Sequence, residues 1–152
     1  MIVDNRGGGN TTIGTSIVAK SPPDGYTILL TTTTHSILPS VMKTPYDPVR
    51  DFVPVATIGI QPHVLVLHPS VPAGTVQDLI ALAKSNPGNL TFASSSSGGT
   101  SHMAGEVFNM LAGVKIRHIP YKGGGSSRAR GSQMLVLSDT LSRIGIFTKR
   151  QL

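Results

Sequence analysis

Runs of aliphatic and β-branched residues alternate along the chain with segments of helical periodicity. Runs rich in aliphatic and β-branched residues at 26–34, 53–60 and 63–69 predict three strands. The first run, YTILLTTTT, is typical of a strand buried on both faces. Short helices are expected at 15–21, ahead of two prolines, and at 35–42.

The second half of the chain has the clearest pattern. Thr75 followed by Asp78 predicts a capping box at the start of a helix with one apolar face. Strands expected at 89–94 and 115–121 flank a second helix, which ends at Gly113. This order of strand, helix, strand, helix and strand indicates the α/β class, with mainly parallel sheets covered by helices.

A polar loop, SSSSGGTS at residues 94–101, lies between the predicted strand and the second of these helices. Ligands of open α/β sheets lie at this kind of junction, because free backbone N–H groups and the helix dipole favour an anion. Hydroxyl donors and two glycines add to that potential: Ser95, Ser96, Ser97, Gly98, Gly99, Thr100 and Ser101. The alternative is a well-capped, flexible connection with Ser101 as N-cap, and the two interpretations are equally open.

Composition excludes several classes of protein. The formal charge is +6, but only 13% of the 152 residues are charged and 5% are aromatic, so no basic stripe or stacking platform for nucleic acid is expected. There is no cysteine, which excludes disulfides and thiolate metal sites. The most apolar stretch is shorter than the roughly 20 residues of a membrane span, and the first residues show no signal-peptide pattern.

No catalytic motif is complete. The GGGNTTIGT segment lacks the lysine of a phosphate loop, and Thr12 stands where a dinucleotide fingerprint needs its third glycine. The SVMK match at residues 40–43 has none of the partner motifs of penicillin-recognising enzymes. His102 and Glu106 share a helix face but lack a third ligand for zinc. We therefore expect no enzyme, no metal and no cofactor.

Several phrases of the sequence occur together, in this order, in a known family. They are PPDGYT, PYDP, HPSVPA, SHMAGEVF and PYKG, and the likeness extends from Val3 to about Gly125. On these residues the chain resembles the extracytoplasmic solute receptors of tripartite tricarboxylate transporters, also called Bug receptors. The resemblance implies a two-lobed periplasmic binding protein of type II, monomeric when complete, that presents a small carboxylate to a membrane permease.

The same resemblance implies how the ligand is held. In the family, backbone amides, hydroxyls and water bind the carboxylate, without an arginine. Carried over by position, the first lobe contributes Thr32, Thr33, Thr34 and His35. The second lobe contributes Ser96, Ser97, Gly98, Thr100, Ser101 and His102, with Tyr121, Lys122 and Gly123 nearby.

The resemblance also predicts the domain organisation. Residues 1–61 are expected to form part of the first lobe and 62–125 part of the second, because Gln61 and Pro62 are suited to a crossing between sheets. Residues 126–152 form a basic segment unlike the family, which we expect to be non-native or disordered. The chain thus resembles a receptor truncated at both ends. Two alternatives stay open: a nonfunctional receptor fragment, and an α/β enzyme or regulator that binds a phosphorylated ligand.

Overall fold

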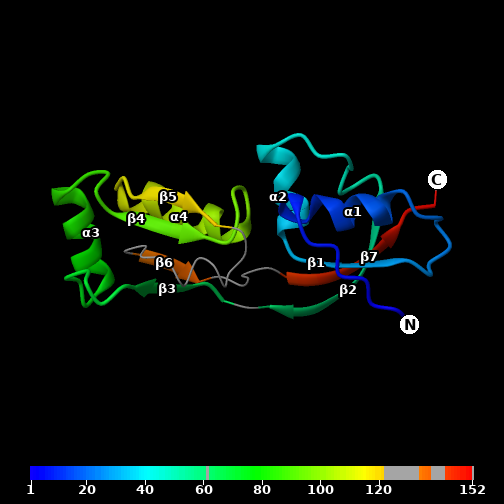
Figure 1. The fold of residues 1–152 in the computed structure, drawn as a ribbon, viewed down its shortest axis with the longest axis horizontal. Coiled ribbons are helices and arrows are strands. Elements are labelled where there is room, and N and C mark those ends of the chain that lie inside the picture. The colour runs from blue at the N-terminus through cyan, green and yellow to red at the C-terminus, as the bar shows by residue number, and fades with distance from the viewer. Residues whose placement is uncertain (61, 122–133, 138–142, 152) are drawn as a thin grey trace. The chain divides into compact units, whose positions relative to one another are not determined.

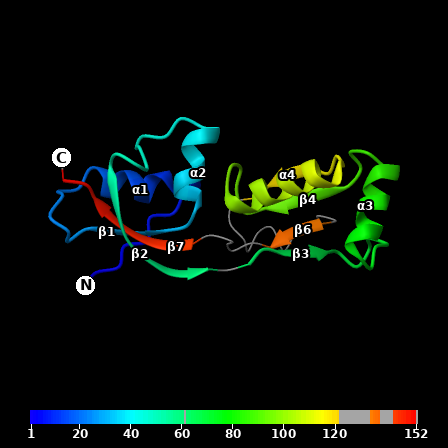
Figure 2. The ribbon, with the colours of Figure 1, turned by 180° about the vertical axis from the view of Figure 1, so that it is seen from behind.

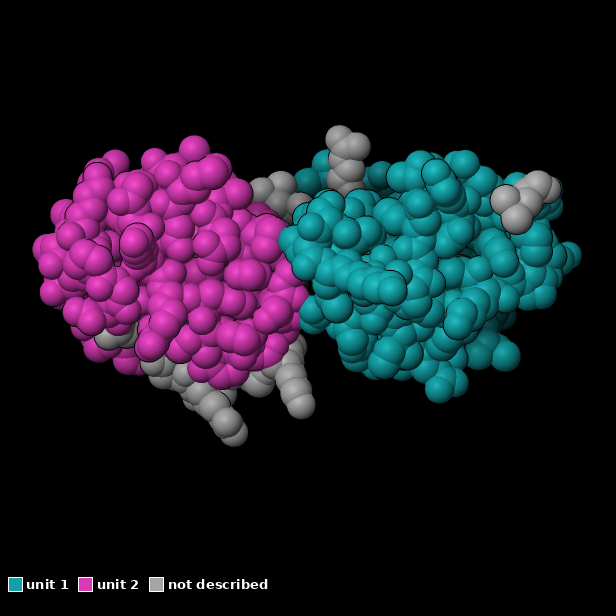
Figure 3. Space-filling model, turned by 90° about the horizontal axis from the view of Figure 1, so that it is seen from above, with its two compact units in different colours: residues 1–61, 140–152 teal, residues 62–139 magenta. Residues whose placement is uncertain are grey.

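The structure is a computed structural model, and it describes residues 1–60, 62–121, 134–137 and 143–151 (Figure 1). The chain divides into two compact units, shown in different colours in Figure 3. The first unit comprises residues 1–61 and 140–152, and the second comprises 62–139. Among the described helices, none combines the length and the apolar character that a membrane span needs.

The first unit is a three-stranded sheet with two main helices. A 3-10 turn, Gly9–Thr11, leads into helix α1, and the order of the strands in the sheet is β1-β7-β2. Both pairings with β7 are antiparallel. The elements are α1 (Thr12–Ala19), β1 (Ile28–Thr31), α2 (Thr34–Val41), β2 (Phe52–Ile60) and β7 (Arg143–Lys149).

Helix α1 covers one face of this sheet and lies against β1 and β7 (Figures 1 and 2). The core contains Val18 from α1 and Leu29 from β1, together with Tyr46 and Phe52. Strand β1 alternates between exposed and buried residues, with Leu30 62% exposed. The prediction that this strand is buried on both faces is therefore wrong, because the described part of the unit places helix α1 over only one of them.

The second unit is a four-stranded sheet in the order β3-β6-β4-β5. Strand β4 is parallel to both neighbours, whereas β3 and β6 are antiparallel. Helix α4 lies along β4, β5 and β6 (Figures 1 and 2). The elements are β3 (Val64–Leu67), α3 (Val76–Ser85), β4 (Thr91–Ser94), α4 (Thr100–Ala112), β5 (Arg117–Pro120) and β6 (Met134–Leu137).

Local sequence explains where helix α3 begins and how α3 and α4 pack in this unit. The capping box predicted for α3 is confirmed: the Asp78 N–H donates to Thr75 Oγ1 at 3.1 Å, and the Thr75 N–H donates to Asp78 Oδ2 at 3.0 Å. Buried Leu79 and Ala83 then carry the apolar face of α3 into the core. Gly105 lets α4 approach β4 closely, because a Cβ there would overlap the ring of Phe92.

The α/β class is confirmed, but the sheets are not mainly parallel: the described pairings of the first sheet are antiparallel and those of the second are mixed. The difference arises in the last part of the chain, residues 126–152, which was expected to be a separate basic segment. Strand β7 comes from that segment and forms the centre of the first sheet, with Phe147 opposite Leu29. The expectation of a disordered extension is therefore wrong for the two strands at 134–137 and 143–149.

Candidate anion-binding site

The loop between β4 and α4 turns sharply at two glycines. Gly98 has a positive φ of 76°, and its N–H donates to His102 Nδ1 at 3.0 Å. Gly99 is the N-cap residue of α4, and a Cβ at this position would overlap the hydroxyl of Ser96. Gly98 favours the left-handed backbone because it carries no Cβ, and a Cβ at Gly99 would fit only if the Ser96 hydroxyl rotated away. The loop therefore favours glycine at both positions, for different reasons.

The first turn of α4 supplies donors at the loop. The backbone hydrogen bond from the Met103 N–H to the Gly99 carbonyl is the first of the helix, at 3.0 Å. By helix geometry, the N–H groups of Thr100, Ser101 and His102 precede it and have no acceptor within the helix. Together with the helix dipole they make this end of α4 electropositive. An anion is the complementary ligand.

Ser101 lies inside the helix rather than at its cap. Its side chain is 1% exposed, and its Oγ lies 3.4 Å from the Ser95 nitrogen and 3.3 Å from Ser95 Oγ. The N-cap role that the alternative interpretation gave to Ser101 is therefore wrong, since Gly99 occupies that position. Ser101 instead links the start of the loop to the first turn of the helix.

Two histidines flank the loop. The rings of His102 on α4 and His118 on β5 are stacked, with centroids 3.8 Å apart and planes 19° from parallel. His118 Nε2 lies 2.6 Å from Ser94 Oγ, and the ring of Phe92 lies 4.9 Å from that of His118. Glu106 Oε1 lies 3.6 Å from His102 Nε2. These contacts connect β4, β5 and α4 directly beneath the loop.

The electrostatics keep His118 neutral. Burial, and to a smaller extent charge repulsion from the neighbouring His102, together lower the pKa of His118 to about 4. The arrangement is not that of a hydrolase triad, because Ser94 contacts one histidine and Glu106 the other. Within the described residues there is no cluster of three metal-ligating side chains.

The chain matches the family model described as the tripartite tricarboxylate transporter family receptor, TctC, over residues 1–140. The chain belongs to this family. The match extends 15 residues beyond Gly125, where the resemblance noted in the sequence ends. The family is one of solute-binding receptors rather than enzymes.

Individual relatives and solved structures of the same kind are also similar to this chain. Protein BugT of Bordetella pertussis is 39% identical over 131 residues, which are 82% of this chain and 39% of BugT. A solved structure described as a periplasmic transporter has a TM-score of 0.80 and 32% identity, over 98% of this chain and 48% of that one. R. palustris Rpa4515, solved with adipate, has a TM-score of 0.78 and 34% identity, over 97% and 48%. The chain thus spans about half or less of the length of these relatives.

The structure brings together the receptor residues predicted in the second unit. Ser96 is half-buried and Ser97 exposed in the loop, whereas Thr100, Ser101 and His102 form the first turn of α4. Tyr121 follows β5, and its N–H donates to the Ser94 carbonyl at 2.9 Å. Lys122 and Gly123 lie outside the described residues.

The receptor residues predicted in the first unit lie at the junction of β1 and α2. Thr32 and Thr33 are half-buried at the start of the helix, and Thr34 is buried. The His35 ring is 1% exposed and stacks on Tyr46, with centroids 5.2 Å apart. Each unit thus has a strand-to-helix junction rich in hydroxyl groups, but the His35 side chain belongs to a core.

Sequence reasoning missed Ser94 and His118. They lie on the adjacent parallel strands β4 and β5. In this register Phe92 pairs with His118, and Ser94 is two residues after Phe92 on β4. The alternation of side chains along a strand was the available signal, because it places Phe92 and Ser94 on one face. Only the pairing register brings His118 to the same place.

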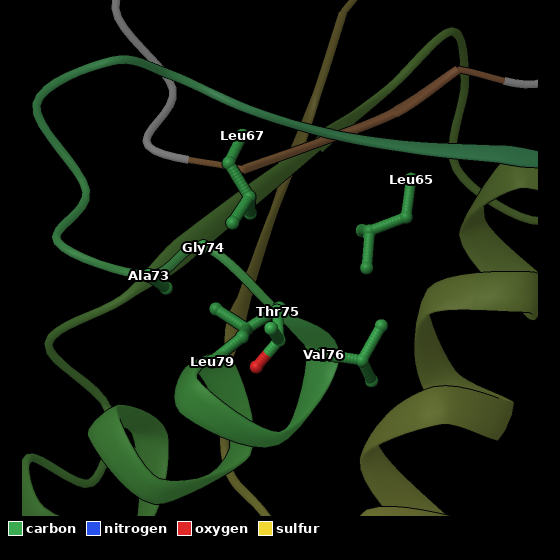
Figure 4. A pocket seen from close by; sticks show the side chains of 7 residues that line it. All are labelled: Leu65, Leu67, Ala73, Gly74, Thr75, Val76 and Leu79. Atoms are coloured by element: carbon green, nitrogen blue, oxygen red, sulfur yellow. The ribbon is translucent and has the colours of Figure 1, made fainter.

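The second unit also has an apolar pocket of about 310 Å³ beside the start of α3 (Figure 4). Its lining is aliphatic apart from Thr75 and consists of Leu65, Leu67, Ala73, Gly74, Thr75, Val76 and Leu79. Binding sites for small polar ligands have several convergent polar groups. The pocket has one hydroxyl, so the β4–α4 loop is the better candidate for an anion.

Proposed function

We propose that this chain binds a small carboxylate at the β4–α4 loop, as part of a receptor for a tripartite tricarboxylate transporter. The observation that carries the proposal is the meeting of Gly98, Gly99 and the N–H groups of the first turn of α4. A carboxylate accepts hydrogen bonds from such groups and is stabilised by the dipole of the helix. The adipate in the related Rpa4515 structure supports this class of ligand.

The donors that the loop itself supplies include no cationic side chain. Among the described residues 94–102, which form the loop and the first turn, none is lysine or arginine. Charge is then compensated by oriented N–H and hydroxyl dipoles, which release a ligand more readily than a bidentate arginine pair. Release is essential for a receptor that passes its ligand to a permease.

We propose that Thr32 and Thr33 of the first unit also contribute hydroxyl groups to ligand binding. Their partial exposure at the start of α2 supports a direct role. Thr34 and His35 are buried, so their contribution is to support the backbone of this junction. Tyr121, Lys122 and Gly123 are proposed to complete the second unit's contribution after β5.

The family supports a proposal for the location and the partners of this receptor. Related structures are described as a periplasmic transporter and as the periplasmic binding protein BugD. We propose that the receptor acts in the periplasm as a monomer and delivers its carboxylate to the membrane permease subunits. No nucleic acid and no cofactor take part.

Thermal unfolding of the 152-residue chain with adipate tests the proposal. A ligand that binds only the native state raises the midpoint, by about 2.7 kcal/mol of stabilisation at a hundredfold excess over the dissociation constant. Adipamide, which has the same carbon chain but no negative charge, is the matched control and should give no shift. A melt unchanged by adipate and by a panel of other di- and tricarboxylates would refute the proposed function.

A further inference from the structure

We infer that His118 is a positioning residue that holds the β4–α4 loop in its ligand-binding shape from below. The inference rests on the proposed function of that loop. His118 reaches the loop by two routes. Its Nε2 contacts Ser94 Oγ at 2.6 Å, and its ring stacks on His102 at 3.8 Å.

Each route continues to the backbone of the loop. The Ser94 hydroxyl donates to the Ser96 carbonyl at 2.8 Å, which holds the start of the loop. His102 Nδ1 accepts from the Gly98 N–H at 3.0 Å, which holds its end. One imidazole on β5 therefore controls both ends of the Ser96–Gly98 turn.

The hydrogen bonds also specify where the protons are. A backbone N–H can only donate, so His102 Nδ1 carries no proton and Nε2 carries it, directed to Glu106. The single proton of the Ser94 hydroxyl goes to the Ser96 carbonyl. His118 Nε2 must therefore be the donor to Ser94 Oγ. Both rings are neutral Nε2–H tautomers in this arrangement.

The charged form of His102 is incompatible with this loop shape. A proton on Nδ1 would break the bond from the Gly98 N–H, and the added charge would face the stacked His118 ring. The groups that face the His102 ring are Glu106 on its own helix, His118 on β5 and the apolar Phe92 on β4. Among these described neighbours only Glu106 could compensate the charge, and it contacts Nε2 rather than the loop.

The loop needs such support because its own side chains provide little. Serine and glycine bury almost no apolar surface, and ordering each backbone residue costs roughly 1–2 kcal/mol. A loop that is ordered before the ligand arrives does not pay this entropy on binding. Histidine is suited to the role because it combines a flat ring for stacking with an N–H donor. Phenylalanine keeps only the first property and glutamine only the second.

Three variants of the full chain separate the two routes. His118→Phe retains the stacking on His102 but loses the hydrogen bond to Ser94. His118→Gln retains a hydrogen-bond donor but loses the stacking. Ser94→Ala removes the hydroxyl that accepts from His118 and so breaks the first route without changing His118. His68→Gln is the matched control, because His68 bonds to Ser70 in an exposed loop after β3. The readouts are adipate affinity, imidazole ¹⁵N chemical shifts and amide hydrogen exchange.

We expect His118→Phe and His118→Gln each to weaken adipate binding about tenfold, which is about 1.4 kcal/mol. Exchange of the Gly98 amide should accelerate by a similar factor, whereas that of Gly88, which donates to the Lys115 carbonyl in the same unit, should not change. The wild-type ¹⁵N shifts should show that Nδ1 is unprotonated in both His102 and His118. His68→Gln should behave as wild type.

The inference is overturned if the His118 variants keep wild-type Gly98 exchange, or if Gly88 and Gly98 accelerate equally, which indicates a general loss of stability. A protonated Nδ1 on neutral His102 in the wild-type spectrum also overturns it. If wild type binds no carboxylate, the proposed function fails, but exchange and tautomers still decide whether His118 holds the loop. The two failures are therefore distinguishable.

Discussion

The Gly98→Val substitution is the sharpest test of the β4–α4 loop. Gly98 has a φ of 76°, a left-handed conformation that costs a non-glycine residue about 1–3 kcal/mol. A β-branched residue can avoid this strain only if the peptide rotates to a negative φ. Rotation would turn the Gly98 N–H away from His102 Nδ1, which it contacts at 3.0 Å.

The chain contains a matched control for the strain. Gly88 has the same φ of 76°, lies in the turn before β4, and would place an added Cβ in open space. Gly88→Val should therefore lower the free energy of unfolding by a similar 1–3 kcal/mol, or roughly 2–4 °C in midpoint for each kcal/mol. Because Gly88 is outside the loop, adipate affinity should not change in this variant.

Calorimetric titration with adipate and thermal unfolding of both variants provide the comparison. We expect an affinity loss of at least about tenfold for Gly98→Val only, since losing the hydrogen bond from the Gly98 N–H to His102 Nδ1 and displacing the loop together cost more than about 1.4 kcal/mol. Equal affinities in the two variants would remove the loop from the binding site. Equal losses would show that overall stability, and not the loop, limits binding.

Three further predictions concern stability and are checked by urea unfolding. Gly105→Ala should lower the free energy of unfolding by about 1–3 kcal/mol, because the new Cβ overlaps the buried Phe92 ring. The cost of this overlap exceeds the gain in helix propensity. A stabilised variant would contradict the close packing of α4 on β4. Thr75→Ala should cost about 1 kcal/mol through loss of the capping box with Asp78, and an unchanged midpoint would argue against the cap. Burial lowers the pKa of His35, and a weaker interaction with the Pro48 carbonyl partly opposes this effect. The unfolded chain therefore takes up a proton near pH 6.5 that the folded chain does not. Stability should fall as the pH drops below about 6.5, and less steeply in His35→Phe; an unchanged slope would refute the assignment.

Local sequence was sufficient for most elements of the fold. The capping box of α3, the glycine that ends α4 and the apolar strands are each encoded within a few residues, so periodicity and turn chemistry locate them. The position of the β4–α4 loop between a strand and a helix follows from the same local signals. The ordered family phrases added the receptor class, which physical patterns alone left open.

Only the tertiary structure decided the pairing of the strands. Strand β7 forms the centre of the first sheet, more than 80 residues after β2, and nothing near Arg143–Lys149 indicates its partners. Partner choice depends on contacts between segments distant in sequence, which a local pattern does not contain. The antiparallel first sheet was unpredictable for this reason.

The candidate site also combines features that local sequence predicts with features that only the pairing of strands creates. Glycines, serines and the start of α4 are contiguous in the sequence, and their chemistry could be inferred there. His118 lies 24 residues from Ser94 and reaches it only because β4 and β5 pair in one register. The sequence by itself therefore determined where the candidate loop lies and which polar groups it carries, whereas the packing of β4, β5 and α4 decided which side chains contact that loop.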